Sequence, residues 1–264
     1  MLVSPPANPI GVLWHARIDV WHAYAPETFS PDIRFMCGIA GCFSTSVSAD
    51  RLAWVRQMAD SLIHRGPDDV GVWADESAGV ALAHRRLAIL DLSPAGHQPM
   101  VSDGGRYVLV FNGEIYNHLD LRKELGKESW RGHSDTETLL VAVQAWGIEE
   151  TLKRTVGMFA LALWDKQGRT LTLARDRFGE KPLFYGWQGG SFLFGSELKA
   201  LAAHPAWQAE VDRDSLTLFM RYGYVPLPRS IWQGVAKLLP GSFLTLSADV
   251  PSGVLPEPTY YWRA

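Results

Sequence analysis

The chain has 264 residues, 47% of them hydrophobic, which is enough for one large domain or two small ones with an ample core. Its formal net charge of -3 and its lack of a basic run argue against nucleic acid or an anionic membrane surface as a partner. We therefore expect chemistry on a small molecule.

Two cysteines, Cys37 and Cys42, are too few for a disulfide framework, and their spacing matches no metal motif. We expect a reducing, cytoplasmic environment and no bound metal. No apolar run approaches the length of about eighteen residues needed to span a membrane. Residues 1–36 show neither helical nor strand periodicity and lack the pattern of a signal peptide, so we expect an unstructured extension before a domain that begins at Cys37.

From Cys37 onwards, apolar patterns predict strands and helices separated by turn residues. One helix begins with a capping box formed by Ser134 and Glu137. Because the strands surround the helices without regular βαβ alternation, we expect mostly antiparallel sheets covered by helices, an α+β layered sandwich. Strands are predicted over residues 39–43, 70–73, 80–83, 107–111, 158–164, 171–174, 183–187 and 192–194, and helices over 50–63, after 117, over 136–146 and around 216–220.

Met36-Cys37-Gly38 carries the most informative chemistry of the chain. Removal of Met36 would give Cys37 both a thiol and a free α-amine, the nucleophile and base of an N-terminal nucleophile. The ordinary pKa values of these groups, about 8.5 and about 7.7 to 8.0, allow either to pass a proton to the other near neutral pH. Any residue bonded to that nitrogen makes it a non-basic amide. For a cysteine taken alone, a buried structural role is the alternative.

Arg85 and Arg86 interrupt an apolar run that should lie in the interior. A partly buried guanidinium needs a carboxylate or phosphate partner. One interpretation is an internal salt bridge, to Asp91 or Asp176, and the other is a fork that binds the carboxylate of a substrate.

Asn112 and Gly113 follow a predicted buried strand, at the mouth of a predicted loop. An Asn amide beside a Gly N–H offers the two donors that an oxyanion hole requires, and glycine permits a backbone conformation that aims the N–H outward. A plain turn is the alternative. Ser134, Asp135 and Glu137 then begin a helix, either as ordinary capping residues or with a carboxylate that holds a substrate ammonium group.

Together these groups suit an α-amino acid with a reactive side-chain carbonyl. Six motifs occur in order: MCGIAG (36–41), HRGPDD (64–69), AHRRLAILD (83–91), FNGEIYN (111–117), SDTE (134–137) and ARDRFGEKPL (174–183). With these motifs the chain closely resembles, from Met36 to about Leu201, the glutaminase half of glutamine-dependent asparagine synthetases. The resemblance implies an N-terminal-nucleophile hydrolase fold, four layers in the order αββα, with L-glutamine as the substrate and no cofactor for the glutaminase half.

The resemblance also implies a role for each candidate residue. A cysteine thiol attacks the side-chain amide of glutamine, ammonia leaves, and water hydrolyses the γ-glutamyl thioester. The implied roles are Cys37 as nucleophile with its own α-amine as base, Asn112 and Gly113 as the oxyanion hole, Arg86 for the substrate carboxylate, and Asp135 helped by Glu114 for the α-amino group.

Asparagine synthetases continue into an ATP-using domain with a Ser-Gly-Gly-x-Asp-Ser loop, and no such loop occurs before Ala264. We expect residues 37–210 to form the amidotransferase domain and 211–264 a connector toward an absent synthetase domain, in which ATP and Mg would bind. A truncated product, a split gene and a separate synthetase chain as partner stay open, as does a homodimer. For residues 1–36 the choices are translation from Met36, a cleaved propeptide, or an extension that persists.

Two functions of different class follow. The first is a glutaminase that supplies ammonia for an amidation, best matched by asparagine formation from aspartate and ATP, with a sugar or another acceptor as the alternative. The second is a catalytically silent glutamine-binding or interaction module, in which the Cys37 amine stays blocked.

Overall fold

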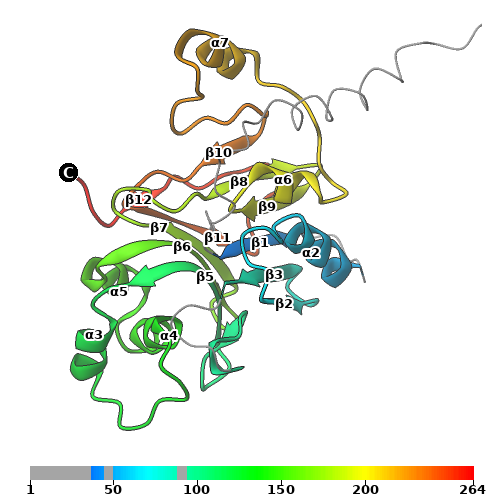
Figure 1. Cartoon of the computed structure of the whole chain (residues 1–264). Helices are drawn as coiled ribbons and strands as arrows, with labels where there is room; N and C mark the ends of the chain where they lie inside the picture. The colour runs from blue at the N-terminus through cyan, green and yellow to red at the C-terminus, as the bar shows by residue number, and fades with distance from the viewer. Residues whose placement is uncertain (1–36, 45–49, 88–93) are drawn as a thin grey trace, which may run out of the picture. The chain divides into compact units, whose positions relative to one another are not determined.

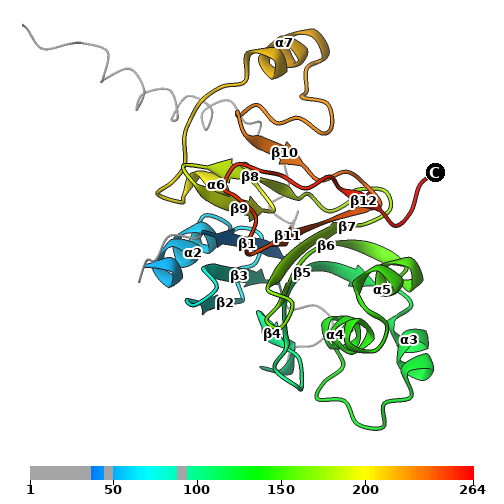
Figure 2. The ribbon, with the colours of Figure 1, turned by 180° about the vertical axis from the view of Figure 1, so that it is seen from behind.

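The computed structural model describes residues 37–44, 50–87 and 94–264. In these residues two six-stranded sheets pack against each other, and helices cover their outer faces (Figures 1 and 2). Every pairing between the named strands is antiparallel, as the sequence predicts.

The two sheets are named sheet A and sheet B. Sheet A has the strand order β10 (Val235–Lys237), β8 (Phe184–Gln188), β9 (Ser191–Gly195), β1 (Gly38–Phe43), β3 (Val80–Arg86) and β2 (Asp69–Asp75). Sheet B has the order β12 (Thr259–Tyr260), β11 (Ser242–Ser247), β7 (Thr170–Arg175), β6 (Gly157–Asp165), β5 (Tyr107–Ile115) and β4 (Met100–Val101). The helices are α2 (Arg51–Asp60), α3 (His118–Leu125), α4 (Asp135–Trp146), α5 (Ile148–Arg154), α6 (Leu198–Ala202), α7 (Arg213–Tyr222) and the short 3-10 helix η2 (Pro94–Gly96).

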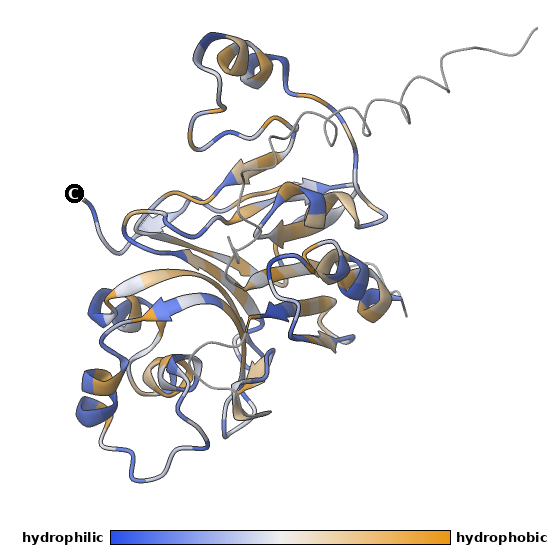
Figure 3. Ribbon diagram, in the orientation of Figure 1, coloured by the Kyte–Doolittle hydropathy of each residue, from blue (hydrophilic) through white to orange (hydrophobic). Residues whose placement is uncertain are grey.

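Side chains alternate across each strand of sheet B and so fill two different apolar layers. In β5, Val108 and Val110 belong to the core between the sheets, whereas Leu109 and Phe111 pack toward α3, α4 and α5. Figure 3 shows the hydrophobic residues, in orange, running along the strands of both sheets.

Sheet A repeats this arrangement with α2 and α6 on its outer face. Ile39 and Phe43 of β1 point into the core between the sheets, while Ala40 and Cys42 pack with Met58 of α2. Three apolar layers therefore separate four layers of backbone in the order αββα, which confirms the predicted fold class.

Two features of the elements differ from the sequence prediction. Strand β5 does not end at Asn112 but continues to Ile115, because its pairing with β6 extends to Ile115 opposite Gly157. The capping box of α4 is half formed: the Ser134 hydroxyl accepts from Glu137 N at 3.2 Å, but the Glu137 carboxylate accepts from the backbone N–H groups of Arg131 and Gly132.

The C-terminal residues contribute strands to both sheets. Strand β10 pairs with β8 in sheet A, and β11 pairs with β7 in sheet B. The boundary at residue 210 stays a prediction, and the predictions for residues 1–36 and for Asp91 lie outside the described residues. In the part of the chain that the structure describes, none of the helices has the length and apolarity needed to cross a membrane.

Candidate active site

The six predicted site residues gather at one end of the two sheets. Cys37 directly precedes β1, Arg86 ends β3, and Asp135 begins α4. Asn112, Gly113 and Glu114 lie in the last part of β5, and β5 contacts both β1 and β3 across the core. Three segments that are far apart in sequence therefore meet around the Cys37 thiol.

The Cys37 thiol is partly buried and held by the backbone of the residue after β3. Its Sγ accepts from Leu87 N at 3.3 Å and lies 3.6 Å from the Leu87 carbonyl oxygen. Burial raises the pKa of the thiol above its ordinary value; the Leu87 hydrogen bond and the charge of Arg86 oppose this, and the charge of Asp135 adds to it. The thiol is therefore protonated at neutral pH and needs a base in order to attack.

A cluster of charged residues holds the Cys37 backbone on the other side. Arg65 Nε donates to the Cys37 carbonyl oxygen at 3.1 Å, and Arg65 Nη1 lies 2.9 Å from Glu197 Oε1. Burial alone would raise the pKa of Glu197, but hydrogen bonds from Arg65, His64 and Lys199 lower it to about 2. Sequence reasoning missed this cluster, although two of its members stand in the HRGPDD motif.

Asn112 is fully buried, yet its amide has no hydrogen-bond partner among the described residues. Neither Nδ2 nor Oδ1 is paired. An unpaired buried polar group costs about 1 to 3 kcal/mol, so proteins rarely leave one without a reason. The arrangement fits a side chain whose partner is a bound ligand.

Gly113 directs its backbone N–H toward the open edge of β5. It lies opposite Phe159, whose N–H and C=O both bond to Asp176, at 3.2 and 2.8 Å. Gly113 and Phe159 are therefore a non-hydrogen-bonded pair, and the Gly113 N–H points away from β6. At the same edge, Phe111 N donates to Gln98 Oε1 and Ile115 N donates to Asp135 Oδ2.

Steric room explains why position 113 is a glycine. Its φ is not positive, so no left-handed conformation is required. A Cβ at this position would lie 2.2 Å from the Met158 carbonyl oxygen and 2.7 Å from the Phe159 Cα. Glycine is needed here because β6 passes too close for any side chain.

Asp135 places a buried carboxylate near the thiol. Besides accepting from Ile115 N at 2.9 Å, it begins α4, whose N-terminus favours negative charge. Burial raises the pKa of Asp135, hydrogen bonds to Ile115 N and Thr136 N and the charge of His118 oppose this, and the charge of Glu114 adds to it. The carboxyl groups of Asp135 and Glu114 thus lie close enough to interact, and together they favour a bound cation beside them.

The two arginines of the AHRRLAILD motif differ in their partners. Arg85 forms an internal ion pair with Asp60 of α2 and donates to the Ala59 carbonyl oxygen at 3.1 Å. The interpretation as a salt bridge therefore holds for Arg85, but its predicted partner Asp176 is wrong, since that carboxylate accepts backbone N–H groups instead. Arg86 acts electrostatically on the Cys37 thiol.

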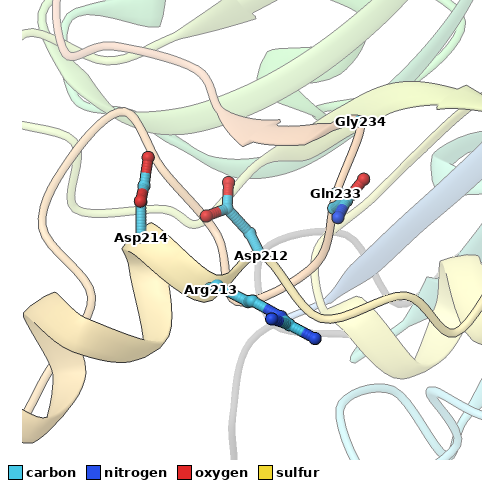
Figure 4. Close-up of a pocket in the computed structure, with 5 residues that line it drawn as sticks. All are labelled: Asp212, Arg213, Asp214, Gln233 and Gly234. Atoms are coloured by element: carbon cyan, nitrogen blue, oxygen red, sulfur yellow. The ribbon is translucent and has the colours of Figure 1, made fainter.

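A separate pocket lies at the start of α7 and contains none of these residues. It is lined by Asp212, Arg213, Asp214, Gln233 and Gly234 (Figure 4). In the described ranges, no group of three or more His, Cys, Asp or Glu side chains is arranged to hold a metal ion.

The sequence matches a known protein family. A family profile described as "Glutamine amidotransferase domain" matches residues 36–262. Asparagine synthetase [glutamine-hydrolyzing] 3 of Bacillus subtilis (strain 168) is 42% identical over 224 residues, which cover 81% of this chain and 35% of that protein. The chain thus spans about a third of the length of this curated relative.

Two solved structures share the fold at low sequence identity. The first is described as the allosteric regulatory enzyme of purine biosynthesis (TM-score 0.63, 19% identity) and the second as the glutamine phosphoribosylpyrophosphate amidotransferase of B. subtilis (TM-score 0.60, 18% identity). Each match covers 86% of this chain and 50% of the other. The shared fold is the four-layer αββα sandwich, and this chain belongs to the glutamine amidotransferase domain family.

Proposed function

We propose that this protein hydrolyses the side-chain amide of L-glutamine and releases ammonia for an amidation reaction. The observation that carries the proposal is the pair of donors beside the thiol: the unpaired amide of the buried Asn112 and the Gly113 N–H at the open edge of β5. A side-chain N–H and a backbone N–H on adjacent residues are the two donors that suit the oxyanion formed when a thiol attacks a carboxamide.

The first half of the reaction forms a thioester. The α-amine of Cys37, freed of Met36, takes the proton that the buried thiol holds at neutral pH, and Sγ attacks the amide carbon. Asn112 Nδ2 and Gly113 N donate to the resulting oxyanion. The C–N bond then breaks, and the amine returns its proton to the leaving nitrogen, which departs as ammonia.

The second half regenerates the enzyme. The α-amine takes a proton from water, the hydroxide attacks the thioester carbon, and the same two donors hold the second oxyanion. The C–S bond breaks, the thiol regains its proton, and glutamate leaves.

Recognition of glutamine follows from the charges around the thiol. The Arg86 guanidinium binds the substrate carboxylate, and Asp135 with Glu114 binds the α-ammonium group. Ionised Asp135 is needed for this step, so binding weakens at acidic pH.

The ammonia acceptor belongs to a separate synthetase activity. Because relatives of this type are named asparagine synthetases, aspartate is the proposed acceptor, with ATP and Mg bound by a synthetase chain and both chains in the cytosol. A second candidate is a glutamine-binding module without turnover, which applies as long as Met36 remains bonded to the Cys37 nitrogen.

The test compares the full chain with a chain that begins at Cys37. Ammonia release from glutamine is measured for both, together with Cys37→Ala and the matched control Cys42→Ala, which changes the other, fully buried cysteine. We expect release from the chain that begins at Cys37, its loss in Cys37→Ala and its retention in Cys42→Ala. Glutamine binding without ammonia from either form would favour the silent module instead.

A further inference from the structure

Two buried side chains hold the backbone N–H and C=O of Phe111, directly before Asn112. Phe111 N donates to Gln98 Oε1 at 2.6 Å, and His84 Nε2 lies 3.1 Å from the Phe111 carbonyl oxygen. Gln98 and His84 are 6% and 1% exposed. Since a carbonyl oxygen only accepts, His84 Nε2 is the donor, and burial lowers the pKa of His84 to about 3 and keeps the ring neutral.

Gln98 takes the place of a strand at the edge of β5. Strand β4 pairs with β5 only at Val101–Val108 and Met100–Leu109, so the next outward-facing N–H, that of Phe111, lies beyond the end of β4. The Gln98 side chain supplies the missing acceptor. The end of β5 is thereby fixed without a neighbouring strand that would cover the Gly113 N–H.

Gln98 also connects this edge to α4. Its Nε2 donates to Thr136 Oγ1 at 3.3 Å, and Thr136 follows Asp135, whose carboxylate accepts from Ile115 N. The Gly113 N–H therefore lies between two neighbouring N–H groups that are both occupied by buried side chains from outside the strand.

We infer that Gln98 and His84 are positioning residues for the oxyanion hole. By fixing the N–H and the C=O of Phe111, they hold the backbone that directs the Asn112 side chain and the Gly113 N–H. The inference rests on the proposed glutamine hydrolysis, and it adds to that reaction two residues that need not touch the substrate. A misplacement of about 1 Å at a reacting group can reduce a rate about a hundredfold, so such support matters to catalysis.

The alternative is that both residues merely satisfy buried backbone groups. Gln188 offers a matched control, because it too is a buried glutamine with a backbone partner at each end: its Oε1 accepts from Gln208 N and its Nε2 donates to the Gln233 carbonyl oxygen. It lies in β8 of sheet A and contacts no candidate site residue through these bonds.

The experiment compares Gln98→Met with Gln188→Met, in whichever wild-type form hydrolyses glutamine, at a temperature where both variants are folded. We measure kcat and KM for glutamine and the rate at which iodoacetamide alkylates Cys37. The alkylation reaction forms no oxyanion, so it reports on the thiol alone. For Gln98→Met we expect kcat to fall about tenfold to a hundredfold. We expect KM to change by less than about threefold and alkylation to stay unchanged, with wild-type values throughout for Gln188→Met.

An unchanged kcat in Gln98→Met, an equal loss in Gln188→Met, or a parallel loss of alkylation would overturn the inference. If Gln98→Met does not fold, His84→Gln and His84→Leu test the same point, because only the first keeps a donor for the Phe111 carbonyl. Their kcat values should differ about tenfold, and equal values would refute the role. Absence of ammonia release by both wild-type forms would instead refute the proposed function itself.

Discussion

Two asparagines, Asn112 and Asn117, lie five positions apart in the chain and show what the burial of an amide means here. Asn117 donates to the Arg154 carbonyl oxygen at 3.0 Å and accepts from Val156 N at 2.9 Å, so both ends of its amide are used by the fold. Asn112 is buried more deeply and uses neither end. The fold thus depends on Asn117, while Asn112 keeps its hydrogen-bonding capacity for a ligand.

This contrast gives opposite expectations for the two alanine variants. Asn112→Ala should lower kcat for glutamine by about a hundredfold to a thousandfold, the cost of one oxyanion donor, with little loss of stability, since no hydrogen bond is removed. Asn117→Ala should lose about 1 kcal/mol of unfolding free energy and keep its kcat. Urea unfolding and steady-state kinetics on both variants check this, and equal kcat losses would contradict it.

Gly113→Ala should be costly for a steric reason. The added methyl group would meet the backbone of β6, which cannot give way as a flexible side chain can, so we expect a loss of about 1 to 3 kcal/mol in unfolding free energy and of most activity. Gly104→Ala is the control, because its nearest neighbour would be Gln144 Nε2 at 4.0 Å. Equal urea midpoints for the two variants would show that β6 yields.

At the scale of elements, the sequence predicts well what is local. The apolar run of β5 and the N-terminal cap of α4 each depend on residues that are neighbours in the sequence, and both are found in the structure. The local sequence does not predict that β5 continues through Asn112 and Gly113. This pair is typical of turns and becomes part of a strand only by pairing with β6. Short α5 and α6, of seven and five residues, lack the length for a periodic signal.

The same distinction holds for the candidate site. Cys37, Arg86, Asn112 and Asp135 could be proposed from chemistry that each motif carries by itself. The bond between Arg65 and Glu197 joins residues 132 positions apart, and no local pattern pairs them. Supporting residues of this kind become visible only when the sheets are assembled.

The N-terminal cap of α4 links helix stability to substrate binding. Ser134→Ala removes the acceptor of Glu137 N, and we expect a loss of about 1 kcal/mol in stability together with a higher KM for glutamine, since Asp135 is the next residue. Asp212→Ala removes the corresponding cap of α7, where Asp212 Oδ1 accepts from Ser215 N at 2.9 Å. It should cost similar stability and leave KM unchanged; a KM shift in both variants would contradict a local effect.

At the scale of the whole molecule, His84 makes global stability depend on pH. Its pKa of about 3 in the folded protein is below the ordinary value of about 6.5, so the unfolded chain takes up the proton first. Stability is therefore present above pH about 6.5 and is lost as pH falls toward 3, by about 1.4 kcal/mol per pH unit from this residue.

His84→Gln should accordingly flatten the fall in unfolding free energy between pH 6.5 and 4. Urea unfolding of the wild type and the variant at a series of pH values measures the slope. A slope in His84→Gln equal to that of the wild type would mean that other groups govern acid unfolding.

The position of β1 in the middle of sheet A has a consequence for the order of events during synthesis. This first described strand lies between β3 and β9, and Ile39 N donates to Ser196 Oγ, 157 positions later. At a synthesis rate of about 5 to 20 residues per second, roughly eight to thirty seconds separate the emergence of these two partners from the ribosome. Cys37 is thus among the first residues of the domain to be synthesised, but β1 can complete its pairing only after β9 has emerged. A nascent chain therefore carries the thiol before the sheet that positions it is complete.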